Sequence, residues 1–384
     1  MNHATDTFDS IVIGGGIVGL SAADALQRRG QRVLLLERFA PGNERGSSHG
    51  DGRIIRVAYP QAYYVELAQF AYAAWARLQQ RAGRTLMQQT GGLDIGHRDS
   101  DDLADVATNF SHFALPFETL SAPQVARRFP PFKLQPDEIA LYQPASGVLF
   151  ATLTLAALWT LLGDGGATLL PHRAVVRIEP QRDGVTVTDD QGDCWRVDHL
   201  VVAAGAWTNS LLGPLGVPLP LTVTQEQVAY FRAPATPDHT MHGMPIFIHY
   251  DKDRVFYGLP RIEIDGVKVA GHHIGHPRHP DQPLPLDEAN RRSVMRFVAS
   301  RLPHLAPVPH HELSCLYTST PDHDFILDRH PIYPQITLGA GFSGHGFKFG
   351  PMIGELLADL ALGDAPSISL APFALTRFAQ ADPK

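Results

Sequence analysis

The 384-residue sequence has only two cysteines, no long apolar run and no excess of basic residues. Cys194 and Cys315 do not make a disulfide framework in a chain of this length, so each is interpreted alone. No run approaches the roughly 18 apolar residues that a membrane-spanning helix needs. Residues 1–8 are polar and lack the basic flank and apolar core of a secretory signal. We therefore expect a cytoplasmic protein that does not enter a membrane.

The charge balance excludes one large class of partners. The chain has 32 Lys and Arg against 39 Asp and Glu, a formal net charge of -7. A protein that binds nucleic acid needs a basic face, which argues against that function here. With 44% hydrophobic and 18% charged residues, the composition is that of an ordinary globular protein, and the length allows two domains.

The N-terminal region has the pattern strand, glycine turn, helix, strand. Phe8–Ile13 is a short apolar run typical of a buried parallel strand, and Arg32–Leu36 is a second one. Between them, Ile17–Arg29 places small apolar residues at helical spacing. This order is the opening of a βαβ unit.

The turn in this unit predicts a dinucleotide site. Gly14, Gly16 and Gly19 form G-x-G-x-x-G between the strand and the helix. The first glycine permits the tight turn, the second lets a pyrophosphate approach the backbone, and the third allows close helix–strand packing. Glu37 ends the next strand, where a carboxylate can accept ribose hydroxyls and would repel the extra phosphate of NADP. This motif alone leaves FAD and NAD both open.

Similar elements return later, with β-rich sequence between them. The expected later elements are a hairpin from Val185–Thr188 and Cys194–Val197, a strand at Leu200–Ala204, several strands over Val223–Ile274, a strand at Ile336–Leu338 and a helix over Pro351–Leu362. The N-terminal, Leu200 and C-terminal elements are of the nucleotide-binding type. We therefore expect two discontinuous domains that are interleaved along the chain.

Three further segments together have the motifs of one known family. They are Gly46–Tyr59 (GSSHGDGRIIRVAY), Ser314–Asp328 (SCLYTSTPDHDFILD) and Gly339–Phe349 (GAGFSGHGFKF). With the glycine motif, they resemble the monomeric sarcosine oxidase and N-methyltryptophan oxidase family, within the D-amino-acid-oxidase-like superfamily. Leu370–Phe378 (LAPFALTRF) leans toward the second member. The resemblance implies FAD as the cofactor and oxidation of a secondary amine.

The resemblance also sharpens the expected fold. It implies a mixed α/β (α+β) architecture with a Rossmann-like FAD-binding domain and a β-rich catalytic domain of mostly antiparallel sheet. The expected FAD-binding parts are residues 1–88, 146–218 and 313–384. The expected catalytic parts are residues 89–145 and 219–312.

For the cofactor, the resemblance implies a covalent bond between Cys315 and the 8α-methyl carbon of FAD. A thiolate is a sufficient nucleophile for this link if nearby positive charge lowers its pKa. The alternative is a buried structural cysteine, which is a common core residue and the interpretation kept for Cys194. Gly344, His345 and Gly346 form the turn expected against the flavin, where the backbone matters more than the imidazole.

For the substrate, the resemblance implies that Arg56 and Lys348 clamp a carboxylate. A guanidinium fork and an ammonium suit that task. Without a substrate carboxylate, both cations would be unpaired in a closed cavity, which costs several kcal/mol each.

For catalysis, the resemblance places Arg53 and Lys268 on opposite sides of the flavin ring. A desolvated Lys268 would stabilise developing superoxide as oxygen takes its first electron. Tyr257, Tyr317 and His272 are expected to line a polar but dry substrate cavity, because the amine must lose a proton before oxidation.

The expected reaction converts a secondary amine with a carboxylate, and molecular oxygen, into an imine and hydrogen peroxide, in a monomeric enzyme. N-methyl amino acids are the first expectation and cyclic imino acids such as pipecolate or proline the second. The chain departs from the family at Ser48 and Gly52. Thr222–Phe231 and Arg261–Asp265 also differ, and these segments could line the cavity and admit another substrate.

Other classes of function explain fewer of these motifs. An NAD-dependent dehydrogenase would leave Cys315 and GFSGHGFKF unexplained, and a non-catalytic flavin-binding protein is a further alternative. Four histidines lie within residues 272–279, but Pro277 and Pro280 break any helix that would align them on zinc. We therefore expect no metal.

Overall fold

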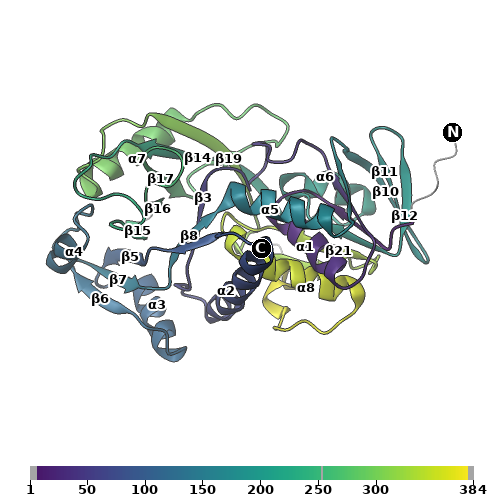
Figure 1. The fold of residues 1–384 in the computed structure, drawn as a ribbon, viewed down its shortest axis with the longest axis horizontal. Coiled ribbons are helices and arrows are strands. Elements are labelled where there is room, and N and C mark those ends of the chain that lie inside the picture. Colours follow the sequence, from purple (N-terminus) through teal and green to yellow (C-terminus); the bar gives the residue numbers. More distant parts are fainter. Residues whose placement is uncertain (1–6, 252–253, 379–384) are drawn as a thin grey trace, which may run out of the picture.

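The computed structural model describes residues 7–251 and 254–378 (Figure 1). The start of the chain, on which the expectation about a secretory signal rests, lies mostly outside these residues. A parallel sheet with α1 (Ile17–Arg28) and α8 (Gly350–Leu362) forms one side of the molecule, and a large antiparallel sheet forms the other (Figure 1).

A six-stranded sheet carries the glycine turn. In spatial order its strands are β20 (Ile326–Arg329), β21 (Ile336–Ala340), β13 (His199–Val202), β1 (Ser10–Ile13), β2 (Val33–Glu37) and β9 (Thr168–Pro171). All neighbours are parallel except β20 and β21. The N-terminal, Leu200 and C-terminal strands are therefore adjacent in one sheet, as the sequence predicts.

Both faces of this sheet are covered, which explains why its strands are apolar throughout. Val12 on β1 packs in the same cluster as α1 and α8, while Ile11 and Ile13 point to the opposite face. There they meet the expected hairpin, which is part of an antiparallel sheet. This sheet consists of β10 (Val175–Gln181), β11 (Gly184–Asp189) and β12 (Cys194–Val197).

The larger sheet is mostly antiparallel, as the resemblance implies. In spatial order its strands are β18 (His276–Pro277), β14 (Thr222–Phe231), β17 (Val267–His272), β16 (Arg254–Leu259), β15 (Ile246–Asp251), β5 (Gly92–His97), β7 (Glu138–Gln143) and β6 (Glu118–Ser121), with β19 (His311–Ser319) pairing β14. The pair β15–β5 is parallel. Because β19 runs along β14 and also carries Cys315, it links the large sheet to the expected cofactor position.

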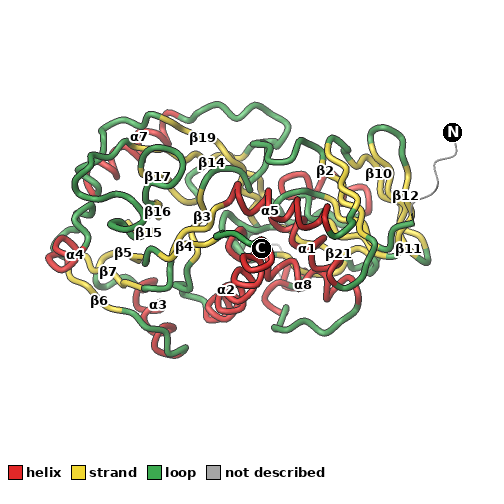
Figure 2. Tube along the Cα trace, viewed as in Figure 1, coloured by secondary structure: helices red, strands yellow, loops and turns green. Residues whose placement is uncertain are grey.

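A small sheet and the remaining helices complete the fold. The small sheet consists of β3 (Gly52–Ile55), β8 (Gly147–Phe150) and β4 (Met87–Gln89). The other helices are α2 (Ala62–Ala82), α3 (Asp101–His112), α4 (Ala122–Arg128), α5 (Ala151–Asp164), α6 (Thr208–Leu212) and α7 (Glu288–Arg301). Helices α3 and α4 lie with β5, β6 and β7 at one end of the molecule (Figure 2). Within the described residues, no helix is both long and apolar enough to cross a membrane.

Several of these helices differ from the sequence-based expectation. The sequence between the nucleotide-type elements was expected to be β-rich, and it also contains the helices α3, α4, α5 and α7. The apolar sequence of α5 packs against α1, so it is buried helix rather than strand. The domain boundaries at 88, 145, 218 and 312 stay a prediction.

Candidate cofactor and substrate site

One cavity of about 850 Å³ connects the glycine turn to the large sheet. This volume lies within the usual range for small-molecule sites, roughly 300–1,000 Å³. Among the expected site residues, those that line it are Gly14, Gly16, Glu37, Arg53, Arg56, Tyr257, Lys268, His272, Cys315, Tyr317, Gly344, His345, Gly346 and Lys348. The fold thus brings together residues that are more than 300 positions apart in the sequence.

Two glycines of the motif, Gly14 and Gly19, leave no room for a side chain. Gly14 has a φ of +110°, and a Cβ there would lie 2.4 Å from the carbonyl oxygen of Ala203. Gly19 does not line the cavity; a Cβ on it would lie 1.9 Å from the carbonyl oxygen of Gly14. Its role is therefore the close approach of α1 to the turn, as the motif predicts.

Glu37 closes this end of the cavity. Its carboxylate accepts hydrogen bonds from the backbone N–H of Gly15 at 2.6 Å and of Phe39 at 2.8 Å. Burial raises the pKa of Glu37, while the two N–H groups act in the opposite direction. Each carboxylate oxygen can accept a further hydrogen bond, so the position suits a ribose hydroxyl.

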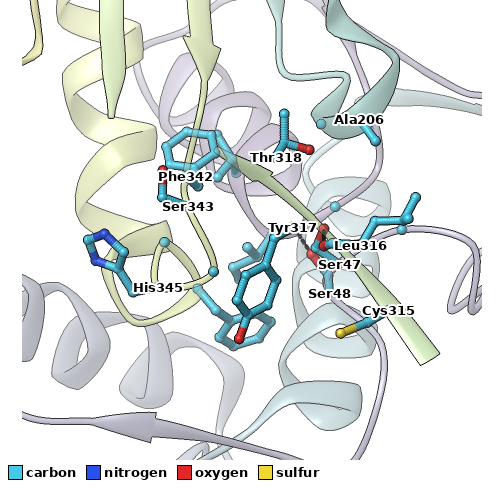
Figure 3. A pocket seen from close by; sticks show the side chains of 18 of the residues that line it. Ser47, Ser48, Ala206, Cys315, Leu316, Tyr317, Thr318, Phe342, Ser343 and His345 are labelled. Carbon is cyan, nitrogen blue, oxygen red and sulfur yellow. Dashed lines mark hydrogen bonds between the residues drawn. The ribbon is translucent and has the colours of Figure 1, made fainter. Parts of the chain in front are cut away.

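The loop before β3 packs against β19. The Ser47 hydroxyl donates to the carbonyl oxygen of Leu316, and the Ser48 hydroxyl accepts from the N–H of Ile17 at 3.2 Å (Figure 3). Arg53 braces the loop by donating to the carbonyl oxygens of Ser47 and Gly52, each at 2.9 Å. Arg53 is therefore held by backbone carbonyls at the cavity wall.

Lys268 is a buried cation on β17. Its side chain is 5% exposed, and its Nζ donates to the carbonyl oxygen of Gly52 at 3.0 Å. The nearest carboxylate oxygen recorded for it belongs to Asp51, at 4.0 Å, and Asp51 also accepts from the Tyr230 hydroxyl at 2.7 Å. Burial lowers the pKa of Lys268 to about 8, and the neighbouring Arg53 adds to this effect. The ammonium is thus poorly compensated and close to deprotonation.

Cys315 and Tyr317 are two residues apart on β19, so their side chains project from the same face of the strand (Figure 3). Burial raises the pKa of the Cys315 thiol, although Arg53 and Lys268 act to lower it. The condition set for a reactive thiolate, a pKa lowered by nearby positive charge, is therefore not met in net direction, because desolvation is the larger effect. The two expected cations are nevertheless near the thiol.

Arg56 has a carboxylate partner that the sequence did not reveal. Its Nη1 donates to Oδ1 of Asp94 at 2.9 Å and to the carbonyl oxygen of Ala58. The guanidinium carbon also lies 4.7 Å from the centre of the Tyr59 ring. The argument that Arg56 would be unpaired without a substrate is therefore wrong, since Asp94 supplies a buried counter-charge.

Lys348 lies beside Arg56, across the ring of Tyr59. Its Nζ donates to the Tyr59 hydroxyl at 2.9 Å and to the carbonyl oxygen of His345 at 3.0 Å. Burial lowers its pKa well below the usual value, and the positive charge of Arg56 adds to this. An anion near Nζ would relieve both effects, so Lys348 retains the properties expected of an anion-binding group.

Aromatic rings form a further part of the cavity wall. His272 Nδ1 lies 3.4 Å from the Tyr317 hydroxyl, and the His272 ring contacts that of Tyr257 edge-on. His273 and His323 continue this wall, with ring centres 4.2 Å apart. Burial lowers the pKa of His272 well below its usual value and that of His273 to about 4, so both rings are neutral near pH 7.

The ring of His345 takes part more than the sequence predicted. Its Nδ1 lies 3.4 Å from the Tyr59 hydroxyl, and Nε2 lies 3.2 Å from the carbonyl oxygen of His323. His345 was expected to act through its backbone, yet its ring joins the Tyr59–Lys348 group.

The two segments that depart from the family, Thr222–Phe231 and Arg261–Asp265, lie differently with respect to the cavity. Val228 on β14 lines the cavity, but residues 261–265 are not among the described lining residues. Of the two segments that could line the cavity, only Thr222–Phe231 therefore contributes a residue to this wall. Among the described residues, no group of three or more His, Cys, Asp or Glu side chains is arranged to hold a metal ion.

The cavity fits an extended dinucleotide. Gly14, Gly15 and Gly16 line its glycine end without side chains, so a pyrophosphate could approach the backbone there. The same cavity reaches Cys315 and Lys268 on the large sheet. A group that spans from Glu37 to Cys315 would contact both sheets, as FAD would.

Comparison with known proteins agrees with this geometry. The family described as FAD dependent oxidoreductase matches residues 9–360. The human peroxisomal sarcosine oxidase is 38% identical over 97% of this chain and 97% of its own length. The N-methyl-L-tryptophan oxidase of Salmonella newport is 32% identical over 97% of this chain and 100% of its own length.

Among solved structures, the open form of NikD, described as an unusual amino acid oxidase essential for nikkomycin biosynthesis, superposes with a TM-score of 0.86. It is 30% identical and covers 96% of this chain and 98% of its own. The sequence match and the shared fold extend over nearly the whole chain. This protein therefore belongs to the family of FAD dependent oxidoreductases.

Proposed function

We propose that this protein is an oxidase of N-methyl amino acids, of the sarcosine or N-methyltryptophan type, with FAD bound covalently through Cys315. The products would be hydrogen peroxide and an imine, which water converts into an aldehyde and the demethylated amino acid. The main support is that one cavity contains a dinucleotide turn, a thiol, and a separate group of cations and aromatic rings. The names of the related oxidases point to the same substrate class.

In this proposal, Gly14, Gly16 and Glu37 hold the nucleotide end of the cofactor, and Cys315 holds its ring. When bound, FAD supplies the two-electron oxidation of a carbon next to nitrogen and passes the electrons to oxygen. The residues around it bind and orient the amine, exclude water and set the charge.

The substrate carboxylate would lie between Lys348 and Arg56. Lys348 Nζ is already fixed by the Tyr59 hydroxyl and the carbonyl oxygen of His345. Arg56 lines the same cavity, and its hydrogen bonds to Asp94 and to the carbonyl oxygen of Ala58 both use Nη1. A carboxylate there would bind charge-assisted donors on two sides, which fixes its orientation as well as its affinity.

The amine would face the aromatic wall of Tyr317, His272 and Tyr257. A secondary amine is protonated in water and must lose that proton before oxidation. Because burial keeps the pKa of His272 low, its ring is neutral and can accept a hydrogen bond or a proton at a nitrogen. The buried Lys268, near Cys315 and Arg53, would supply the positive charge that favours electron transfer to oxygen.

A peroxide-coupled screen tests the proposal. The purified protein is supplied with sarcosine, N-methyltryptophan, proline, pipecolate and amino acids with primary amines. Peroxide release with the first two supports the proposal. Activity confined to proline or pipecolate would support the alternative, a cyclic imino acid oxidase. Activity confined to primary amines, or to amines without a carboxylate, would overturn both.

We also propose a cytoplasmic location. Cys194 and Cys315 are not joined in a disulfide, which suits a reducing environment. Recovery of the protein in a membrane or organelle fraction of its source cells would contradict this.

A further inference from the structure

The pair of Arg56 and Asp94 joins the cavity wall to the interior of the large sheet. Asp94 lies in the middle of β5, where its side chain is 1% exposed, and Arg56 is 12% exposed. Arg56 lines the cavity, whereas Asp94 lies behind it. Nη1 of the guanidinium is therefore tied to the sheet, while the residue also forms part of the cavity wall.

Asp94 is only partly satisfied in this arrangement. Oδ1 accepts from Arg56 Nη1 at 2.9 Å and from the Tyr250 hydroxyl at 3.5 Å. Oδ2 is buried and has no hydrogen-bond partner among the described residues. A buried carboxylate with one oxygen unpartnered is costly, so its charge is maintained mainly by Arg56.

We propose that Asp94 is a positioning residue that anchors Arg56 and, through its negative charge, weakens the binding of a substrate carboxylate. This inference rests on the proposed role of Arg56 in binding that carboxylate. Both anions lie against the same guanidinium, so they repel each other inside a cavity where water screens little. Neutralising Asp94 while keeping its hydrogen bond should therefore strengthen carboxylate binding.

Protonation of Asp94 would have the same effect. Burial raises its pKa to about 6, with Arg56 acting to lower it. A protonated carboxyl can still accept from Nη1 through one oxygen, so the anchor is kept while the charge is lost. The affinity for a carboxylate should therefore rise as the pH falls through about 6.

Other ionisable groups face this pair from neighbouring elements. Tyr250 comes from β15, Tyr59 follows β3, and His272 ends β17. His345 and Lys348 come from the C-terminal glycine-rich segment, and Asp102 on α3 lines the same cavity. Burial raises the pKa of Tyr59 and Tyr250 above the usual tyrosine value, so both stay neutral across the relevant pH range. Burial lowers the pKa of His272 and His345 well below the usual histidine value, so both rings stay uncharged there as well. Lys348 gains charge as the pH falls and would also strengthen anion binding, which makes the Asp94 variant necessary.

Calorimetric titration of the FAD-loaded protein with acetate measures this without any oxidation. In the wild type, we expect the Kd for acetate to fall by about fivefold to tenfold between pH 8 and pH 5.5. Asp94→Asn should bind acetate at pH 8 about as tightly as the wild type binds it at pH 5.5. Its remaining pH dependence should be small and attributable to Lys348. Asp94→Ala, which also loses the anchor, should bind more weakly than Asp94→Asn.

Asp102→Asn is the matched control, because it removes the same charge at the exposed rim of the same cavity. It should leave both the Kd and its pH dependence nearly unchanged. A wild-type Kd that does not change between pH 8 and 5.5 would overturn the inference, even if Asp94→Asn did not fold. So would an Asp94→Asn protein that binds acetate no more tightly than the wild type.

Arg56→Gln separates the inference from the proposed function. If acetate binds the wild type and Arg56→Gln equally well, or binds neither, then the proposed carboxylate site is wrong. If Arg56→Gln loses binding but Asp94→Asn has no effect, then only the role of Asp94 is wrong.

Discussion

Lys268 is a buried ammonium whose charge depends on pH close to neutrality. Burial lowers its pKa to about 8, so the cationic form is lost as the pH rises through that value. Lys268→Met, which has a similar length and no charge, should slow the reaction of the reduced enzyme with oxygen by about 100-fold. Stopped-flow mixing with oxygen measures this, and anaerobic mixing with substrate should show nearly unchanged reduction.

The wild-type oxygen step should also slow as the pH rises through about 8, because the protonated form supplies the charge. Lys133→Met, at an exposed site, is the control and should behave like the wild type. A Lys268→Met protein with slow anaerobic reduction and normal reoxidation would show that this role is wrong.

Cys315 offers a second single-residue prediction. Cys315→Ser keeps the size of the side chain but cannot form the thioether, so acid precipitation should release its flavin into the supernatant. The wild type should retain its flavin in the pellet. Cys194→Ser, at an exposed position on β12, is the matched control and should also retain it. Flavin that cannot be extracted from Cys315→Ser would rule out the proposed link.

At this scale, the sequence predicted which residues meet but not how they are paired. Arg56, Lys268, Cys315 and Lys348 do line one cavity. Asp94 was missed because its partner lies 38 positions away, and the pairing depends on β5 joining the large sheet. An aspartate inside the apolar strand GGLDIG was the available signal, since a buried charge needs a partner.

At the scale of secondary-structure elements, the close contact between α1 and the glycine turn can be tested by substitution. Gly19→Ala would bring a methyl group to 1.9 Å from the carbonyl oxygen of Gly14, so the helix must shift. We expect a loss of about 3 kcal/mol or more, with weaker FAD retention. Gly163→Ala near the end of α5 adds the same methyl group where no atom lies within 4 Å.

Thermal unfolding of the two variants measures the difference. Gly163→Ala should keep or slightly raise the melting temperature, because alanine favours the helix over glycine by about 1 kcal/mol. Gly19→Ala should lower it clearly. Equal melting temperatures for the two variants would mean that close packing at Gly19 is not what the motif requires.

Elements with a simple pattern were the predictable ones. Strand β1, helix α1, strand β2 and the hairpin β11–β12 lie within a few residues of their expected positions. Their signals are local, namely short apolar runs and glycine turns. Helices α3 and α7 were not predicted, and both pack against the large sheet. Tertiary contacts decide such segments, so a single sequence leaves them ambiguous.

At the scale of the whole molecule, each large sheet draws on distant parts of the chain. The six-stranded sheet uses residues 10–37, 168–202 and 326–340, while the other uses residues 92–143 and 222–319. This agrees with the expected interleaving, although β19 begins at His311 and pairs with β14, close to the proposed boundary at 312. The cavity between the two sets of elements exists only once both have formed.

The proposed monomeric state is the last property that can be tested at this scale. A stable homodimer needs about 800 Å² of each subunit in its interface, usually with an apolar centre. Among the described residues, the large hydrophobic side chains that are clearly exposed come from five separate segments of the chain: Phe70, Val176, Leu286, Val308 and Ile332. Single exposed residues of this kind are normal on the surface of a monomer. The cavity residues that the proposed reaction uses also come from one chain, so activity needs no second copy.

Sedimentation velocity of the FAD-loaded protein at micromolar concentrations should therefore give a single species near the chain mass of 42.0 kDa. A boundary that moves to about twice this mass as the concentration rises would contradict the prediction and place an interface on a surface that these five residues do not mark.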